Sequence, residues 1–451
     1  MRRYVLPLGL AAILCSPTSV SAQAGARAES VLPTVPAVVG SLTLSEALAL
    51  AEQANASLRL KRAEIDAADG VVDDAAALFD SNPELSGSLT RRRVSPGADE
   101  PSRWTEWNAG VTQTVEIGGQ RGYRRSAAEA ARSALSAEID DARRRVRAEV
   151  TDRFYRVIAL QRRVALETQA QRLFDDTSAA VQKRRRAGED TRLDANVATV
   201  EAERARNQLA LAEEQLIDAR RDLAASLQLA SDALPAASGD LDPSPSAYQL
   251  PDLLLSAERQ PRVRALTARE SSAEARLRLE RAKRVPDVTV GVSVGREGPA
   301  NGTLANGIGT QSSISGRERL ATISLSVPLP LFKRNQLGVG QAATQFDQAQ
   351  IERQTTQRDL RATIVALWSR LQSVTARVRR LQEQVVPALD DNQTLSIKSR
   401  AAGQIALLEL IVVNRQALDA RRDLLDAQTE YQTTRAALEL AAGWPTHGSE
   451  R

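Results

Sequence analysis

Residues 321–336 read ATISLSVPLPLFKRNQ and join a strand pattern to a long helical pattern. Up to position 327 every odd-numbered residue is apolar, and threonine or serine stands between them. This period of two predicts a strand with one apolar face. Pro328 and Pro330 then end the strand, because proline has no N–H to donate to a sheet. Helix-forming sequence follows Asn335, so the stretch predicts a direct junction between a strand and a helix.

The same junction occurs earlier in the chain. Residues 107–117 read WNAGVTQTVEI, again with mostly apolar residues at alternate positions, and Gly118 and Gly119 follow where the later copy has proline and leucine. Two further strand patterns, residues 84–93 and 288–295, precede the two junctions. Each copy therefore predicts a hairpin of two strands, and the chain is predicted to be an internal duplication.

Long helical patterns follow each junction. No proline interrupts residues 124–186, which predicts a helix on the order of 90 Å long. A glycine turn comes next, and residues 191–229 predict a return helix with leucine and alanine at heptad spacing. The later copy repeats this order, with a kink or a break between two stacked helices expected at Pro387 and a turn at residues 401–404. The two long helices of each copy are therefore predicted to fold back on each other as an antiparallel pair.

A shorter helical pattern precedes each hairpin, at residues 42–78 and at residues 248–285. Ser45 is the expected N-cap of the first helix, and Asn82-Pro83 is its expected end. The loop inside the second hairpin, from position 296 to position 319, is rich in glycine, asparagine and serine and is predicted to have no regular structure.

The chain is expected to begin with a secretory signal peptide, because a basic start, a short apolar stretch and small residues before position 23 follow one another. Lipidation of Cys15 is an alternative, but Leu14 stands where a lipoprotein signal has a small residue. The segments expected along the chain are a signal peptide at 1–22, an N-terminal arm at 23–41, a first repeat at 42–230, a linker at 231–247, a second repeat at 248–443 and a tail at 444–451.

Composition argues against several kinds of site. Cleavage of the signal peptide would remove the only cysteine and the only methionine, and the single histidine, His447, lies in the tail. No soft-metal site can be built from what is left. An enzyme is also disfavoured by the missing cysteine and the isolated histidine, and no metal site, cofactor or catalytic site is predicted. The formal net charge of +4 gives no case for nucleic acid. Since no apolar run after the signal peptide is long enough for a transmembrane helix, a membrane crossing has to use strands.

Four strands cannot close a barrel, and open strand edges are not tolerated in lipid. Strands that cross a membrane would therefore come from several chains, and three chains would contribute twelve strands with their apolar faces toward lipid. Two alternatives remain open. One is a small sheet packed on helices in a globular fold, which the length of the helices disfavours. The other is a periplasmic coiled-coil scaffold or adaptor without a membrane barrel.

The repeated order of helix, hairpin, long helix, glycine turn and return helix resembles the TolC-like outer-membrane efflux proteins. Residues 327–336, VPLPLFKRNQ, and residues 115–130, VEIGGQRGYRRSAAEA, are most similar to the CzcC-like heavy-metal branch of that family. The resemblance implies a mainly α fold with a β-barrel part. Such a protein is a homotrimer, with a twelve-stranded barrel in the lipid of the outer membrane and a barrel of coiled-coil helices in the periplasm.

The resemblance also implies a function. The chain would be a passive conduit and not an enzyme, and it would export divalent heavy-metal cations from the periplasm to the exterior. Its partners would be a periplasmic adaptor (a membrane fusion protein) and an inner-membrane pump of the RND type. Within the same family, export of drugs or of secreted proteins is the alternative.

By the same resemblance, the turns between the long helices are the sites where the adaptor docks. The residues expected there are Arg186, Gly188 and Leu193 in the first copy, and Gly403 and Leu408 in the second. The glycines would allow a tight reversal of the chain, and the leucines would contact the adaptor.

Asp194 and Glu409 follow these leucines and are possible gate acids, because three copies of an acid around a pore form a ring that favours cations. The alternative is that each acid sits in the first turn of a helix, where a carboxylate interacts favourably with the helix dipole. Two acid pairs at matching positions, one beginning at Asp175 and one at Asp390, are interpreted as parts of helix surfaces.

Gly118, Gly119, Pro328 and Pro330 are expected at the junction between the membrane barrel and the helical barrel.

Overall fold

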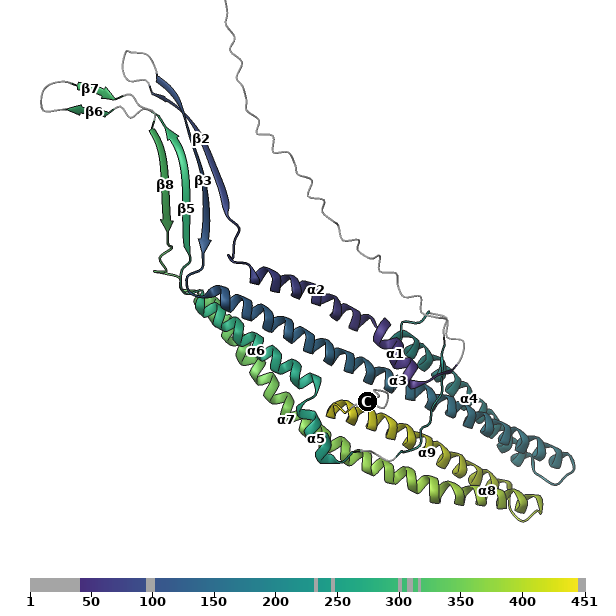
Figure 1. Ribbon diagram of the computed structural model, residues 1–451. Helices are drawn as coiled ribbons and strands as arrows, with labels where there is room; N and C mark the ends of the chain where they lie inside the picture. The colour runs from purple at the N-terminus through teal and green to yellow at the C-terminus, as the bar shows by residue number, and fades with distance from the viewer. Residues whose placement is uncertain are drawn as a thin grey trace, which may run out of the picture.

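The computed structural model describes residues 41–94, 102–230, 234–244, 248–298, 302–305, 311–314 and 318–444. The predicted signal peptide, Cys15, nearly all of the N-terminal arm, and His447 with the rest of the tail beyond Trp444 lie outside these residues. The molecule is long and bent (Figure 1). A sheet of four long strands forms one end of it, and the remaining length is a body of nearly parallel helices whose turns lie at the opposite end.

The four predicted strands form a single antiparallel sheet in the order β2-β3-β5-β8. Pairing between β3 and β5 joins the hairpin of the first copy to that of the second. A small hairpin, β6-β7, forms within the segment that was expected to be an irregular loop, so that prediction is wrong in part. The strands are β2 (Glu84–Val94), β3 (Ser102–Val115), β5 (Val288–Glu297), β6 (Gly302–Ala305), β7 (Gln311–Ile314) and β8 (Glu318–Ser326).

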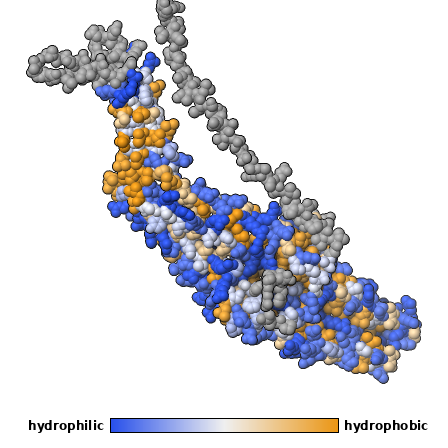
Figure 2. Space-filling model, viewed as in Figure 1, coloured by the Kyte–Doolittle hydropathy of each residue, from blue (hydrophilic) through white to orange (hydrophobic). Residues whose placement is uncertain are grey.

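The register of the sheet places apolar side chains on one face and polar side chains on the other. Leu85, Val111, Val292 and Ile323 form one row across the four strands. The neighbouring row is Ser86, Gly110, Ser293 and Thr322, and its side chains point to the other face because alternate residues of a strand do so. Leu85 is 82% exposed and Ile323 is 81% exposed. Figure 2 shows hydrophobic colour over these strands, whereas the helical body is mostly hydrophilic.

The helical body is built around one uninterrupted helix of 67 residues, α3 (Gln120–Arg186). Pro387 does not break the corresponding helix of the second copy. Instead, a π-helical turn, Leu381–Val385, ends two residues before it, and the missing N–H of the proline is accommodated near this turn. The other long helices are α4 (Arg192–Ser226), α7 (Gln336–Arg380), α8 (Val386–Ala401) and α9 (Leu407–Ala442).

The two shorter helices each prove to be a pair, so the prediction of single helices is wrong. Residues 42–78 form α1 (Leu44–Ala54) and α2 (Ala56–Ala76), and residues 248–285 form α5 (Leu250–Glu258) and α6 (Pro261–Ala282). In the first pair, Asn55 leaves the helical conformation with ψ 123° and caps α2 with its side chain. In the second, Gln260 precedes a proline, which disfavours helical geometry at Gln260.

Two further details of the first helix differ from the prediction. Its N-cap is Thr43, not Ser45: the Thr43 hydroxyl accepts the Glu46 N–H at 3.4 Å, and the Glu46 carboxylate accepts the Thr43 N–H at 2.8 Å. This is a capping box, which satisfies two backbone donors at once. The second half of the pattern, α2, ends at Ala76, well before Asn82-Pro83.

Helices are stacked end to end on both sides of α3. In the half of the body near the sheet, α3 packs against α2 and α6, and toward the turns it packs against α4 and α9. The end of α4 meets the start of α2, and the end of α9 meets the start of α6. These two places are called the first and the second helix joint below.

Apolar cores surround the helix joints. One core packs α1 on α3 and α4 around Phe154 and Leu223, and the other packs α5 on α7 and α9 around Tyr248 and Leu438. Beside the first core, two short strands pair in parallel: β1 (Ser41–Leu42) and β4 (Ala236–Ala237). The predicted linker is therefore held against the start of the first repeat.

Candidate functional site

The two turns between the long helices have the same geometry. Gly188 and Gly403 both adopt positive φ, at 82° and 74°. The N–H of the next residue donates to a carbonyl five residues back in both cases, at 2.9 Å to Arg184 and at 2.9 Å to Ser399. This is the Schellman arrangement, in which glycine avoids the strain that a Cβ atom would cause. Figure 1 places both turns at the same end of the molecule.

The residues expected to dock an adaptor are on the surface of these turns. Leu193 is 71% exposed and Leu408 is 65% exposed, and Arg186 is exposed as well. Beneath the leucines a small apolar cluster holds the two turns together, formed by Val181, Ala195, Ala198, Leu407 and Ile411. The leucines are thus presented on a packed base, and their docking role stays a prediction.

Asp194 and Glu409 are each the third residue of a helix. The Asp194 carboxylate accepts the Thr191 N–H at 3.0 Å and the Thr191 hydroxyl at 2.6 Å, and its own N–H donates to that hydroxyl at 3.1 Å. The side-chain hydrogen bond from Thr191 holds the pKa of Asp194 below its usual value. The Glu409 carboxylate accepts the Ala406 N–H at 3.3 Å. Both acids therefore cap helices, and a role as gate acids stays a prediction.

Asp190 is the acid that connects the two turns. Its side chain is only 5% exposed and accepts hydrogen bonds from Arg184 at 3.1 Å and from Arg400 at 2.7 Å. Arg400 also donates to the Ile405 carbonyl at 3.1 Å. One buried carboxylate thus links the turn of the first copy to the turn of the second. Sequence reasoning missed this contact, because its partners are 210 residues apart.

Two more ion pairs join the copies along α9. Arg415 donates to Glu201 of α4 at 2.8 Å, and Arg422 donates to Glu167 of α3 at 3.0 Å. The acids are buried, with side chains 8% and 1% exposed. The arginines are seven residues apart and so lie on one face of the helix. This spacing is readable in the sequence, although the acidic partners are not.

The two acid pairs that were interpreted as helix surface make equivalent contacts. Asp175 accepts Arg206 at 2.8 Å, and Asp390 accepts Arg421 at 2.7 Å. Each pair is 31 residues apart and joins the two long helices of its own copy. The duplication therefore extends to individual ion pairs.

At the first junction, glycine is required by close packing. A Cβ atom on Gly118 would lie 2.7 Å from Cβ of Val285, and Gly119 has φ 75°. Gln120 is 2% exposed. Its amide accepts the Gly118 N–H at 2.6 Å and donates to the Val285 carbonyl at 3.0 Å and to Asp287 at 3.1 Å. The start of α3 is thereby tied to the start of β5.

The second junction uses a different residue for the same turn. Asn335 has φ 51°, and its amide donates to the Glu280 backbone carbonyl at 2.9 Å and to the Glu280 carboxylate at 2.7 Å. Pro328 and Pro330 follow the last residue of β8, as expected. The prolines end the hydrogen-bonded strand, and the left-handed conformation of Asn335 turns the chain into α7. Asparagine is the residue other than glycine that most readily adopts this left-handed conformation.

No group of three His, Cys, Asp or Glu side chains that could hold a metal ion occurs among the described residues. In the same part of the chain, no helix combines the length and the apolar character needed to span a membrane.

The sheet has one exposed apolar face and is joined to long helices that are stacked end to end, an elongated architecture that suits a subunit of an outer-membrane channel. The chain belongs to the outer membrane efflux protein family, whose sequence model matches residues 47–228 and again residues 253–444. It is 31% identical over 447 residues to the cobalt-zinc-cadmium resistance protein CzcC of Cupriavidus metallidurans, covering 98% of this chain and 99% of that protein.

Solved structures show the same fold. The outer-membrane channel OprN matches with a TM-score of 0.73 and 17% identity, covering 89% of both chains. The outer membrane protein VceC of Vibrio cholerae matches with a TM-score of 0.72 and 18% identity, covering 89% of this chain and 96% of that one. The predicted family and the predicted mainly α fold with a β part are confirmed. The protein is an outer-membrane efflux channel that extends into the periplasm, and not an enzyme.

Proposed function

We propose that three copies of the chain form one channel, with a twelve-stranded barrel in the outer membrane. The observation that carries this proposal is the sheet. Within the described part of one chain, β2 and β8 each have a strand neighbour on one side only, and the apolar face of the sheet is exposed. Lipid cannot satisfy an open strand edge, whereas pairing β8 of one copy with β2 of the next closes the sheet.

Strand length supports a membrane crossing. β2 has 11 residues, β5 has 10 and β8 has 9. A tilted strand needs about 9–11 residues to cross the apolar core of a membrane. The apolar rows would face lipid, and the serine and threonine rows would face a water-filled lumen.

The helix turns are the proposed contact with the rest of a tripartite efflux system. The exposed Leu193 and Leu408, with Arg186 beside the first turn, would dock a periplasmic adaptor, and the adaptor would connect the channel to an inner-membrane RND pump. The matching geometry at Gly188 and Gly403 supports this role, because six nearly equivalent turns in a trimer offer a repeating surface to a ring of adaptors.

The proposed substrates are divalent heavy-metal cations. Support comes from the relative CzcC, whose name refers to cobalt, zinc and cadmium resistance. A conduit need not bind the ion that it passes, so the cargo does not require a coordination site. Asp194 and Glu409 near the turns would contribute negative charge at the periplasmic end of the channel.

Deletion of the gene tests this function, with growth measured on cobalt, zinc and cadmium and on a panel of dyes and antibiotics. The proposal predicts increased sensitivity to the metals, restored by the wild-type chain on a plasmid. Increased sensitivity to organic compounds alone would contradict the metal assignment. Recovery of the mature protein in the soluble periplasm would contradict the channel itself.

A further inference from the structure

The apolar face of the sheet ends in a group of arginines, at the end of the sheet that lies away from the helices. This end holds the last residues of β2 and β5 and the first residues of β3 and β8 (Figure 1). Arg296 and Arg319 are directly opposite each other and lie in one row with Trp107 and Leu89. Further out on β2, alternate residues continue the same face. Four arginines of this face, called the arginine belt below, are Arg91, Arg93, Arg296 and Arg319.

The acids of the same strands lie on the opposite, polar face. Glu297 and Glu318 are directly opposite each other on it, next to the paired arginines of the belt. Glu106 lies on this face too and forms an ion pair with Arg92 at 3.5 Å. Arg92 stands between two belt residues in the sequence, and the alternation of the strand places it on the polar face. The two signs of charge are thus separated, with the acids on the polar face and the belt on the apolar face.

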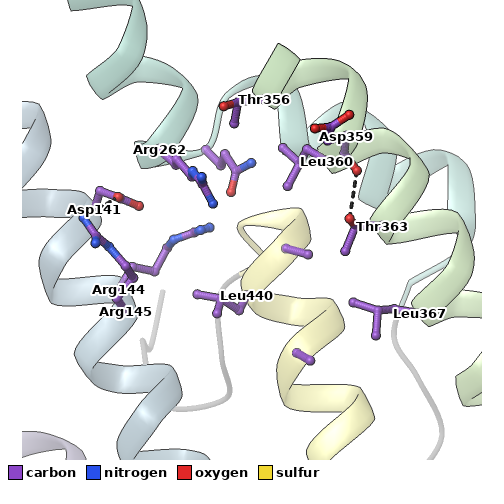
Figure 3. Close-up of a pocket in the computed structure, with 13 residues that line it drawn as sticks. Asp141, Arg144, Arg145, Arg262, Thr356, Asp359, Leu360, Thr363, Leu367 and Leu440 are labelled. Atoms are coloured by element: carbon purple, nitrogen blue, oxygen red, sulfur yellow. Dashed lines mark hydrogen bonds and ion pairs between the residues drawn. The ribbon is translucent and has the colours of Figure 1, made fainter. Parts of the chain in front are cut away.

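The belt has no counter-charge on its own face. Within the described part of the chain, none of its arginines forms an ion pair. In the helical body, by contrast, arginines commonly pair with acids: beside the cavity drawn in Figure 3, Arg145 pairs with Asp141 at 2.9 Å. Arg91, Arg93 and Arg319 are exposed, and like charges directly opposite each other destabilise a sheet. The belt therefore favours an anion supplied from outside the chain.

The depth of the belt in the membrane follows from the proposed barrel. Since the helices extend into the periplasm, the far end of the sheet lies at the outer leaflet. Trp107 is 44% exposed in the row of Arg296, and tryptophan is enriched where the apolar core of a membrane meets the head groups. An arginine on the lipid face costs least at that depth. Figure 2 agrees with this boundary, because the hydrophobic colour of the strands gives way to hydrophilic colour at this end.

We propose that the arginine belt binds the phosphate groups of lipopolysaccharide, the lipid of the outer leaflet. A guanidinium group can donate two parallel hydrogen bonds to one phosphate, and clustered basic residues at a membrane surface attract anionic lipid heads. The inference rests on the proposed function, because it requires the apolar rows of the sheet to face lipid. Phospholipids of the inner leaflet meet the sheet at its other end, so the position of the belt selects the lipid of the outer leaflet.

Lipid binding to the full-length trimer tests the proposal. Trimers stripped of lipid in detergent are mixed with lipid A, the phosphorylated part of lipopolysaccharide, and the bound lipid is measured by native mass spectrometry. Lipid A with both phosphates should bind about tenfold more tightly, or better, than the same lipid after enzymatic removal of the phosphates, because one hydrogen bond to a charged group already contributes about tenfold. Equal binding of the two lipids would overturn the proposal. This comparison uses the wild-type chain and does not depend on the assembly of a variant.

Two pairs of substitutions locate the site. Arg91→Gln with Arg93→Gln, and Arg296→Gln with Arg319→Gln, should each weaken the binding of lipid A about tenfold or more. Arg92→Gln is the matched control, because it removes the neighbouring arginine of the polar face. An equal loss of binding in Arg92→Gln, or no loss in either pair, would overturn the assignment to the belt.

Phosphatidylglycerol tests whether the belt recognises any anionic lipid. If this lipid binds as tightly as lipid A, the assignment to lipopolysaccharide is wrong. Failure of the barrel itself has a different signature, because the protein would then be monomeric and absent from the outer membrane before any lipid is added. Trimers in the outer membrane that do not distinguish lipid A from its dephosphorylated form would reject the lipid site and leave the proposed barrel standing.

Discussion

Replacement of Asp190 by asparagine is expected to loosen the contact between the two helix turns. The carboxylate is 5% exposed and Arg400 is 17% exposed, so solvent screens this pair only weakly. Loss of one buried hydrogen bond between charged groups costs about 2 kcal/mol. If the turns open locally, amide exchange in them should become about thirtyfold faster, because 1.4 kcal/mol corresponds to a factor of ten.

Hydrogen-exchange mass spectrometry on the purified protein measures this change in peptides that cover residues 181–205 and 396–412. Arg400→Gln should accelerate exchange to a similar extent, and the double variant should exchange little faster than either single variant, because both remove the same contact. Asp175→Asn is the matched control: its ion pair lies within one copy and should leave the second turn unaffected. An amide-exchange rate in the turns that is unchanged in Asp190→Asn would refute the reasoning. So would a double variant whose exchange is accelerated by the product of the two single-variant factors.

Three further predictions concern the junction, the helix cap and the adaptor surface. Gly118→Val should abolish trimers on a semi-native gel, because even a Cβ atom at this position would lie 2.7 Å from Cβ of Val285. Gly122→Val is the control and should still form trimers, because a Cβ atom there has no neighbour within 4 Å outside its own helix backbone. Thr191→Ala should destabilise the first turn by about 1 kcal/mol in amide exchange at pH 7. The Thr191 hydroxyl also donates to the Asp194 carboxylate and lowers its pKa, so the part of this difference that depends on the ionised carboxylate should be lost as pH falls through that lowered pKa. The part that comes from the Asp194 N–H bond to the hydroxyl should remain, and a difference that does not shrink at all would contradict the prediction. Leu193→Asp and Leu408→Asp together should abolish metal resistance while trimers remain in the outer membrane; full resistance would rule out the docking role.

The strands could be predicted because their signal is local. Alternation of apolar and polar residues fixes which side chains share a face, and the observed register aligns those faces across all four strands. The turns between the long helices could also be predicted from the sequence, because Gly188 and Gly403 mark them directly. For Asp194 and Glu409, the sequence left two interpretations open, and the structure adds the hydrogen bonds that make both residues caps.

Other features depend on contacts that no local pattern contains. The break at Asn55 interrupts a helical pattern that looks continuous, because its side chain satisfies the end of a helix that is 171 residues distant. The break between α5 and α6 had a local signal in the sequence, Pro261, although residues 248–285 were predicted as a single helix. The link between Asp190 and Arg400 joins the two copies, and only the packing of one copy on the other brings these residues together.

Disulfide cross-linking between strand edges tests the central proposal, a barrel shared by three chains. The only cysteine of the chain lies in the predicted signal peptide, so engineered cysteines have no competitor in the mature protein. One cysteine replaces Ser86 on β2, and a second replaces Thr322, Ser324 or Ser326 in turn, all on the polar face of β8.

Oxidation of outer membranes should convert at least one of these double-cysteine proteins into covalent dimers and trimers and nothing larger, while each single-cysteine protein stays monomeric on a denaturing gel. Such a ladder that ends at three is what a closed ring of three chains predicts. Monomers at every β8 position, or a ladder that continues beyond three, would contradict the account.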